Sequence, residues 1–302
     1  MLLVLATVSA CSSSDSNPAT EPPADQDSGT GGSSGAGGAA GAAGANTGGA
    51  AGAACAVDCG PVEQCFDGVF CVAKTVTMPA GFGIDATEVT RAQYEAWLNT
   101  NPSTSGQPSM CWKKSDFVPE TSGEDFGCTN AIWPPGANGD LPVVCVDWCD
   151  ANAYCAGVGK RLCGKIGGGG NDYGDDANAA ASQWFAACSS GGQNGFTYGN
   201  TLQPQTCNGA DNTLSGGSNG RVLPVASLDG CHAPAGGYAG VYDMSGNAAE
   251  WEDSCEPSGA SYSCRVRGGS FLSYSTDTRC DAGMGSTVNA RSRDTGFRCC
   301  TP

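Results

Sequence analysis

The chain has 302 residues, 47 of them glycine, and carries 30 acidic against 14 basic residues for a net charge of −16. Nucleic-acid binding requires clustered lysine and arginine, so this composition excludes it. The single histidine, His232, excludes sites that need several histidines, including a nonheme iron site and a His-Glu-x-x-His protease site. His232 lies in the glycine- and proline-rich stretch CHAPAGG and is interpreted as a loop residue.

The chain begins with an apolar segment, MLLVLATVSA, which is too short to span a bilayer and is typical of a secretory signal. Cys11 follows Val8-Ser9-Ala10, which resembles a bacterial lipoprotein cleavage box. We therefore interpret residues 1–11 as a lipoprotein signal and Cys11 as the lipidated N-terminus, with an ordinary secretory signal as the alternative. The expected location is extracytoplasmic, with a membrane contact through the lipid anchor. Ser12 is compatible with sorting to the outer membrane or cell surface.

Residues 12–54 consist mainly of glycine, alanine, serine and proline. No apolar face can be drawn on them, so they cannot offset the entropy of ordering. The segment is expected to be a disordered tether with an r.m.s. reach of roughly 35 Å.

The cysteine content indicates an oxidising compartment, because 19 cysteines without a metal-cluster pattern suit a disulfide framework. Without Cys11 the number of cysteines is even. Residues 55–74 are expected to form a small cysteine-rich stub with two local disulfides, whose connectivity stays open, among Cys55, Cys59, Cys65 and Cys71.

The main domain is expected to span residues 75–302. Its first part reads as a strand followed by a helix, and Thr90 can cap a helix that begins at Arg91. A second apolar run reaches Asp147 and is followed by a predicted helix. That helix would place four residues on one side, namely Trp148, Ala151, Tyr154 and Cys155.

After residue 163 the chain is rich in glycine, asparagine, aspartate and serine, which predicts long ordered loops held by disulfides and metal. Residues 164–171, GKIGGGGN, are similar to a phosphate-binding loop. The P-loop needs its lysine after the glycines, whereas Lys165 precedes them, so a turn stapled at Cys163 is the alternative.

Four segments, in this order and at this spacing, resemble the sulfatase-modifying-factor family, whose founding activity is that of the formylglycine-generating enzyme. They are IDATEVTRAQYEAWL (84–98), PVVCVDWCDANAYCAGVGKRL (142–162), GVYDMSGNAAEWED (240–253) and the cysteine-bearing C-terminal segment 265–299. The resemblance implies an α+β fold, the irregular C-type lectin-like fold of this family, with little regular secondary structure and many disulfides.

The resemblance also implies two disulfides, Cys155–Cys299 and Cys188–Cys280. Three local pairs are further expectations from spacing, namely Cys255–Cys264, Cys111–Cys128 and Cys207–Cys231. Four cysteines remain unassigned, namely Cys145, Cys149, Cys163 and Cys300.

Calcium is a cofactor that the resemblance implies. The family's ligand segment matches Asp243 and Glu250, which would supply carboxylates, and Gly246 and Ala248, which would supply carbonyls. A capped turn with solvated acids is the alternative. A second family site would use Asn208 and Gly209, but its other half falls in residues 214–224, which lack the expected aspartate.

The family's oxidase binds Cu(I) through two cysteines, and here the matching positions carry hydroxyls. Ser273 stands at the first position, and Thr278 stands near the second because the loop is shorter. Cys280 matches a disulfide position instead. Ser270 matches the active-site serine, whereas Ala249 replaces the family's tryptophan. A hydroxyl cannot replace a thiolate on Cu(I), so no copper is expected.

Two functional hypotheses follow. In the first, the domain is a non-catalytic, calcium-supported module that binds a protein, peptide or carbohydrate. Aromatic residues that could serve such binding, or simply anchor the core, are Trp112, Trp133, Tyr173, Trp184 and Tyr198. In the second, an altered oxidoreductase uses a free thiol of Cys280, Cys163 or Cys300. Complete pairing of the 18 cysteines after Cys11 would count against the second hypothesis.

Overall fold

The computed structural model describes residues 55–122, 127–128, 133–213, 220–234 and 236–302. The predicted lipoprotein signal with Cys11 and the predicted tether of residues 12–54 lie outside the described residues. Within the described ranges, no helix has both the length and the hydropathy that crossing a membrane requires.

The cysteine-rich segment forms the hairpin of β1 (Glu63–Phe66) and β2 (Phe70–Ala73). Disulfides Cys55–Cys65 and Cys59–Cys71 close it. The hairpin shares the main core, because Phe70 and Val72 pack in the same cluster as the first helix. Sulfur atoms of three of these cysteines lie within 4.8 Å of one another, but each is in a disulfide and is therefore not a thiolate metal ligand.

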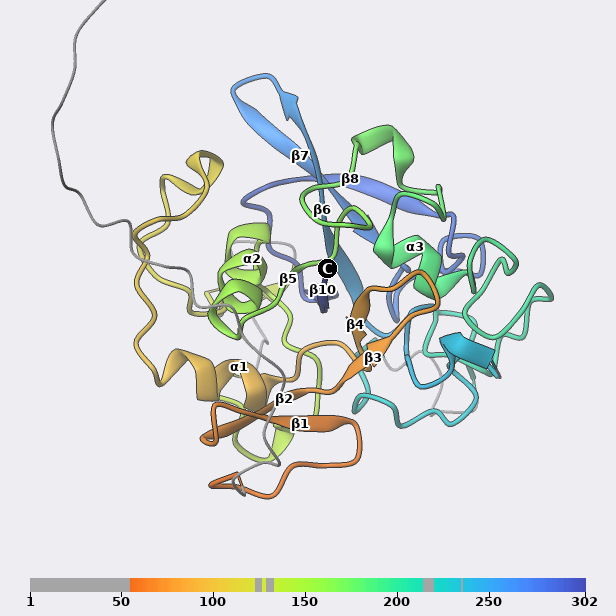
Figure 1. Ribbon diagram of the computed structural model, residues 1–302, viewed down its shortest axis with the longest axis horizontal. Coiled ribbons are helices and arrows are strands. Elements are labelled where there is room, and N and C mark those ends of the chain that lie inside the picture. The colour runs from red at the N-terminus through yellow and green to blue at the C-terminus, as the bar shows by residue number, and fades with distance from the viewer. Residues whose placement is uncertain (1–54, 123–126, 129–132, 214–219, 235) are drawn as a thin grey trace, which may run out of the picture. The chain divides into compact units, whose positions relative to one another are not determined.

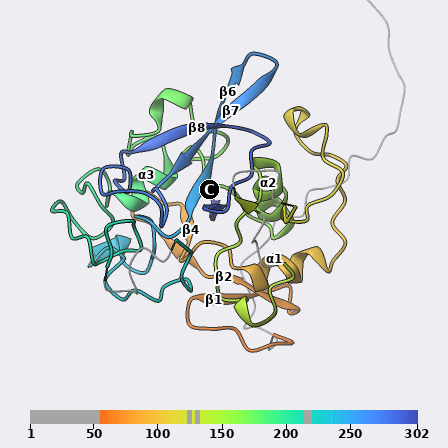
Figure 2. The ribbon, with the colours of Figure 1, turned by 180° about the vertical axis from the view of Figure 1, so that it is seen from behind.

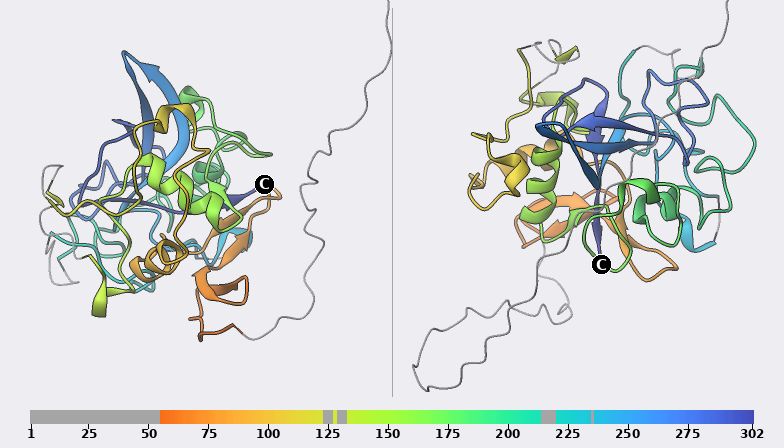
Figure 3. Two further views of the ribbon diagram at one scale, coloured as in Figure 1. Left: turned by 90° about the vertical axis from the view of Figure 1, so that its left-hand side faces the viewer. Right: turned by 90° about the horizontal axis from the view of Figure 1, so that it is seen from above.

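Two four-stranded sheets form the centre of the fold (Figure 1). The first has the order β3-β4-β10-β5 and consists of β3 (Thr75–Thr77), β4 (Gly83–Asp85), β10 (Cys299–Thr301) and β5 (Arg161–Leu162). The second has the order β8-β7-β6-β9 and consists of β8 (Gly283–Thr287), β7 (Ser261–Arg267), β6 (Ala249–Ser258) and β9 (Thr295–Phe297). Only the β6–β9 pairing among these is parallel. The end of the β6–β7 hairpin extends away from the other strands (Figure 3).

Three α-helices flank the strands: α1 (Arg91–Leu98), α2 (Trp148–Gly157) and α3 (Gln183–Cys188) in the described part of the chain. Helices α1 and α2 lie together on one side of the central strands, and α3 lies on the other (Figures 1 and 2). The described residues also include short 3₁₀ segments, among them Ser109–Cys111, Gly136–Asn138, Tyr173–Asp175 and Gly236–Tyr238.

The predicted start of α1 is confirmed. The Thr90 hydroxyl accepts a hydrogen bond from the Gln93 amide, and the Gln93 side chain accepts one from the Thr90 amide, which satisfies two helix-end donors at once. Helix α2 begins in the same way, because Asp147 and Asp150 exchange hydrogen bonds of 2.9 and 3.0 Å between side chain and backbone. The helix predicted after Asp147 is therefore also confirmed.

An aromatic cluster joins α1, α2 and β9. Tyr94 stacks on Tyr154 with ring centroids 5.6 Å apart, and both rings contact Phe297 edge-on. Trp97 packs against the same rings. Burial of such large apolar rings is the main favourable contribution to folding here, so this cluster anchors the helices to the second sheet.

All 18 cysteines in the described residues are paired, and the nine disulfides include Cys155–Cys299, Cys188–Cys280, Cys255–Cys264 and Cys207–Cys231. The expected pair Cys111–Cys128 is wrong. Cys111 bonds to Cys149 and Cys128 bonds to Cys145, because the turn that carries Cys111 packs against the first turn of α2.

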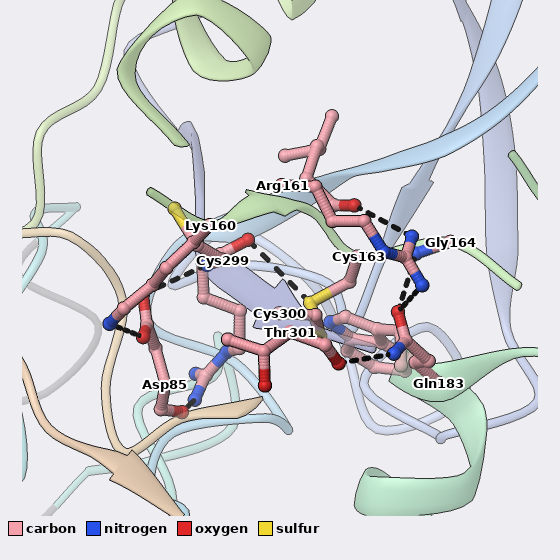
Figure 4. The surroundings of a disulfide bond; sticks show 12 residues. Asp85, Lys160, Arg161, Cys163, Gly164, Gln183, Cys299, Cys300 and Thr301 are labelled. Atoms are coloured by element: carbon pink, nitrogen blue, oxygen red, sulfur yellow. Dashed lines mark hydrogen bonds and ion pairs between the residues drawn. A yellow bond between two sulfur atoms is a disulfide. The ribbon is translucent and has the colours of Figure 1, made fainter. Parts of the chain in front are cut away.

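The ninth disulfide, Cys163–Cys300 (Figure 4), starts from the residue next to Cys299, which forms the bridge Cys155–Cys299. Cys299 and Cys300 are neighbours in β10 and point to opposite faces of the strand, so one bridge reaches α2 and the other reaches the end of β5. The Lys160 ammonium forms an ion pair with the Asp85 carboxylate, which also accepts a hydrogen bond from the Cys299 amide.

Candidate functional site

The loop that follows β7 forms one wall of a cavity of about 480 Å³ beside the second sheet. The Ser270 hydroxyl faces this cavity, donates to Asp294 Oδ2 at 2.8 Å and accepts from the Leu272 amide at 3.2 Å. The Ser273 hydroxyl accepts from the Ser270 amide at 3.0 Å. Ser270 and Ser273 therefore lie in contact with each other in this loop.

Thr278 does not line this cavity. Its hydroxyl donates to the Ser275 carbonyl at 3.3 Å, and with Ser273 it borders a much smaller space of about 20 Å³ on another side of the loop. Both residues lie near Gly209, since the Ser273 carbonyl oxygen and Thr278 Cγ2 would be 3.3 and 3.5 Å from a Cβ at that position. The two hydroxyl residues therefore occupy one corner of the loop, but only Ser273 faces the main cavity.

Copper does not fit these residues. Soft Cu(I) is held by thiolates, whereas the side chains here are hydroxyls already engaged in hydrogen bonds. The neighbouring cysteine, Cys280, is bonded to Cys188. No cysteine in the described residues offers a thiolate, because every one of them is in a disulfide.

A second group of polar residues lies buried around the segment 243–250. The Glu250 carboxylate accepts from Arg298 Nε and Nη2 at 2.7 to 2.9 Å and from Trp184 Nε1 at 2.8 Å. Arg298 is itself fully buried, and the neighbouring Glu250 carboxylate raises the pKa of the guanidinium against the opposing effect of burial. Glu250 thus has its charge neutralised within the protein.

Asp243 has no such cation partner in the described structure. Its Oδ2 accepts from the Ala226 amide at 2.6 Å, and burial raises the pKa of the Asp243 carboxyl to about 6. Asp243 and Asn247 both have φ of 62°, in the left-handed region that non-glycine residues rarely adopt. The segment is thus held in a tightly curved conformation. At Gly246 a Cβ would lie 2.6 Å from the Asn208 carbonyl oxygen, so only glycine fits there.

Glu88, just before α1, completes this group and was not assigned to a site from the sequence. Its Oε1 accepts from Asn247 Nδ2 at 2.9 Å and from the Ala248 amide at 3.4 Å. Its Oε2 is buried and has no hydrogen-bond partner. Burial, together with the charges of Asp243 and Glu250, raises the pKa of Glu88 well above its usual range. In the sequence, Glu88 is one of two acidic residues in the segment IDATEV (84–89), where they alternate with apolar residues, and this pattern alone did not point to a site.

The residues of this group fit a hard divalent cation. Glu88 and Asp243 are buried carboxyl groups without an ion-pair partner among the described residues, and one carboxyl oxygen is unpartnered. Two uncompensated buried carboxylates are costly unless a cation or protons neutralise them. Carboxylate and carbonyl oxygens are the ligands that calcium prefers. The residues that could hold it are Glu88, Asp243 and the carbonyls of Gly246 and Ala248, while Glu250 is occupied by Arg298.

The second expected calcium site stays a prediction, although Asn208 and Arg221, a described residue of its other half, lie in contact. Asn208 donates to Asn247 Oδ1 at 2.9 Å and to the Arg221 carbonyl at 3.2 Å, so its amide group supports the first site. The Gly209 amide donates to the Cys207 carbonyl. Most of the remaining half, residues 214–219, lies outside the described residues.

The other sequence candidates have structural roles. The glycine-rich segment 164–171 folds back on itself through a hydrogen bond from the Lys165 amide to the Gly169 carbonyl. The Asp253 carboxylate lies close to Gly170. Its negative charge would repel a phosphate bound by this segment. His232 bonds to the Ala233 carbonyl and contacts the Tyr242 ring, as a structured loop residue.

The five aromatic candidates differ in exposure. Trp184 is completely buried, and Trp133, Tyr173 and Tyr198 are half-buried. Trp112 is 77% exposed. Only Trp112 among the five therefore presents most of its ring to solvent.

Comparisons with known proteins agree with this architecture. The family model for a sulfatase-modifying factor enzyme 1-like domain matches residues 43–301. The formylglycine-generating enzyme of Mus musculus is 30% identical over 278 residues, which cover 75% of this chain and 67% of the mouse protein. The formylglycine-generating enzyme of Bos taurus is 33% identical over 186 residues, which cover 53% of this chain and 44% of the bovine protein. The chain thus spans less than half the length of the bovine enzyme.

A relative named inactive C-alpha-formylglycine-generating enzyme 2, from Mus musculus, is 32% identical over 174 residues, which cover 53% of this chain and 49% of that protein. Among solved structures, CarF is similar with a TM-score of 0.49 and 22% identity, over 73% of this chain and 86% of that chain. PvdO from Pseudomonas aeruginosa has a TM-score of 0.47 and 19% identity, over 74% of this chain and 82% of that chain. The family match over residues 43–301 shows that this chain belongs to the sulfatase-modifying factor family, and it has the irregular α+β, C-type lectin-like fold expected of it.

Proposed function

We propose that this chain is a non-catalytic member of its family that acts as a binding module, supported by calcium and displayed outside the cytoplasm. Its ligand is a protein, peptide or carbohydrate. The family membership is the starting point, and the chemistry of the loop after β7 supports the loss of the oxidase reaction.

The observation that carries this proposal is the absence of an available thiolate at the positions of the copper cysteines. Ser273 and Thr278 carry hydroxyls, and Cys280 beside them is bonded to Cys188. A hydroxyl loses its proton only at a pH far above neutral, so it cannot bind Cu(I) as a thiolate does. A family member of mouse bears the name of an inactive enzyme, which is compatible with non-catalytic members.

Calcium would support this module at Glu88 and Asp243, with the carbonyls of Gly246 and Ala248. These residues come from segments far apart in the chain, before α1 and before β6. A cation held between them would neutralise two buried carboxylates and tie both segments together. Its role in the proposal is structural, because it keeps the curved segment 243–248 in place.

Display would depend on Cys11 and on the segment that follows it. A lipid chain on Cys11 would anchor the protein to the outer membrane or cell surface, and residues 12–54 would act as a tether of roughly 35 Å reach. Such a tether leaves the folded domain free to meet a ligand in any orientation.

The alternative is a formylglycine-type oxidoreductase with an altered site. The cavity beside Ser270 and the Ser270–Asp294 hydrogen bond favour a retained substrate pocket. This alternative needs a free thiol at Cys280, Cys163 or Cys300. All three are in disulfides, which argues against it.

The first experiment tests oxidation directly. The full chain is incubated with Cu(I), O₂, calcium and a peptide that carries the Cys-x-Pro-x-Arg motif, and mass spectrometry follows the peptide cysteine. We expect no formylglycine, while an active family enzyme in a parallel reaction converts the peptide. Conversion by this chain would overturn the proposal.

A matched thiol measurement separates the two hypotheses. The unfolded, unreduced chain is treated with iodoacetamide and digested. We expect no label on any cysteine from Cys55 to Cys300, because each is in a disulfide. Label at Cys280, Cys163 or Cys300 would support the oxidoreductase.

A further inference from the structure

A cavity of about 680 Å³ lies away from the loop after β7 and has no role in the site described above. Four separate parts of the chain line it, namely residues 109–116, the start of α2, the turn of the β6–β7 hairpin and residues 288–291. Its volume lies in the range of pockets that hold small ligands. The disulfide Cys111–Cys149 crosses its lining and fixes two of these parts together.

An exposed tryptophan forms one side of this cavity. Trp112 is 77% exposed, the largest exposed fraction among the large hydrophobic residues of the described chain. The Lys113 ammonium lies 5.0 Å from its ring centroid. The backbone on both sides of Trp112 is held by hydrogen bonds from the Cys111 amide to the Pro108 carbonyl and from the Lys114 amide to the Cys111 carbonyl. The indole is thus presented to solvent from a structured turn.

A network of charges also borders the cavity. Lys114 Nζ lies 2.8 Å from Asp147 and 2.5 Å from Asp150, and its side chain is only 8% exposed. Arg291 lies 3.3 to 3.6 Å from Asp147, Asp150 and Glu120. Each cation of this network therefore has acidic partners. The lining adds one further cation, Lys113, and one further acid, Asp116, so the cavity as a whole carries no surplus positive charge for an anionic ligand.

The remaining lining supplies neutral hydrogen-bonding groups. Ser109, Ser261 and Asn289 line the cavity together with the Tyr262 ring. An aromatic face beside paired donors and acceptors suits a ligand that is apolar on one face and carries hydroxyls around its edge. A pyranose ring has this character, because its C–H face packs on an indole and its hydroxyls both donate and accept hydrogen bonds.

We propose that this cavity binds a neutral saccharide of about one to three sugar units, which stacks on Trp112 and hydrogen-bonds to the polar groups of the lining. The inference rests on the proposed binding role and names its ligand class. The Cys111–Cys149 disulfide and the network around Asp147 hold the site in shape before the ligand arrives, so little ordering is needed on binding.

The test uses the full chain and three neutral probes, maltotriose, cellotriose and triacetylchitotriose, with binding followed by saturation-transfer NMR and calorimetry. Sialyllactose and a heparin-derived disaccharide serve as anionic probes. We expect at least one neutral probe to bind, with an affinity that is the same at low and high salt. Trp112→Ala should weaken it by about tenfold or more, and Trp112→Phe by less.

Tyr274→Ala is the matched control, because Tyr274 is also an exposed aromatic, at 64%, but does not line the cavity. Circular dichroism checks that each variant is folded. The inference is overturned if no neutral probe binds, if only the anionic probes bind, or if Trp112→Ala and the parent bind equally well. None of these outcomes alters the formylglycine assay, so failure of this inference and failure of the proposed function are distinguishable.

Discussion

Among single residues, Glu88 is a buried acid with a carboxyl oxygen that has no hydrogen-bond partner in the described structure. One carboxyl oxygen is hydrogen-bonded to Asn247 and Ala248, and the other is buried without a partner. An unpaired buried acid costs stability unless it is protonated or bound to a cation. Glu88 is therefore the residue that best reports whether calcium binds here.

We expect calcium to raise the midpoint of thermal unfolding of the parent chain and to have little effect on Glu88→Gln. The amide keeps the shape of the side chain but removes the charge that would bind the cation. Differential scanning calorimetry in EDTA and in excess calcium measures both values.

Glu256→Gln is the control for that measurement, since Glu256 is an exposed acid in β6. It should respond to calcium as the parent does. If calcium does not change the parent, or if it stabilises Glu88→Gln by the same amount, then calcium does not bind at Glu88.

At the scale of elements, the N-terminus of α2 carries both a helix cap and a charge network. Asp147 and Asp150 satisfy each other's backbone amides and also face Lys114 and Arg291. Burial raises the pKa of Asp150 to about 7, with the Asp147 carboxylate adding to the rise and the two cations opposing it. This element should therefore respond to pH.

A carboxyl whose pKa is higher in the folded state holds more protons when folded, so its contribution to stability is present below the unfolded pKa and is lost as pH rises to the folded value. For Asp150 that loss falls between about pH 4 and pH 7. We expect the free energy of unfolding of Asp150→Asn to fall less steeply than that of the parent across this range, with a difference of up to about 1.4 kcal/mol per pH unit.

Urea unfolding at a series of pH values measures the slope of the free energy of unfolding against pH. The slope is compared rather than the stability at one pH, because Asp150→Asn also removes ion pairs. Asp116→Asn, at an exposed acid on the same cavity, should keep the parent slope. Identical slopes for Asp150→Asn and the parent would refute the assignment.

At the scale of the whole molecule, two neighbouring disulfides fasten the C-terminal strand. Cys155–Cys299 and Cys163–Cys300 span 144 and 137 residues, and both end on β10. Once one of them has closed, the other closes only a loop of about 10 residues. The two bridges therefore restrict the unfolded chain in nearly the same way.

We expect each bridge, replaced alone by alanine pairs, to cost about 3 kcal/mol in the loop-entropy model. Removing both should cost roughly 7 kcal/mol, because the link between α2 and β10 is then lost as well. That link closes a loop of roughly 50 residues while Cys188–Cys280 is intact. Denaturant unfolding of the two double variants and the quadruple variant gives these values. Strictly additive losses would contradict the shared restriction.

The local elements could be predicted from the sequence because their signals are local. Thr90 and Asp147 are caps whose partners lie three residues away, so both helix starts were correct. Spacing gave the correct pair Cys207–Cys231 but the wrong pair Cys111–Cys128. Cys111 pairs with Cys149 instead of the nearer Cys128, because packing of the turn against α2 decides which sulfur atoms meet.

The family, the fold class and the cap at Thr90 could be recognised from the sequence alone, because each depends on residue identity or on short-range order. The tertiary structure decided that Glu88 meets Asn247 across 159 residues and that Arg298 neutralises Glu250. It also decided that Trp112 is exposed while Trp184 is buried. These features depend on which distant segments pack together, and packing of irregular loops has no periodic signal in the sequence.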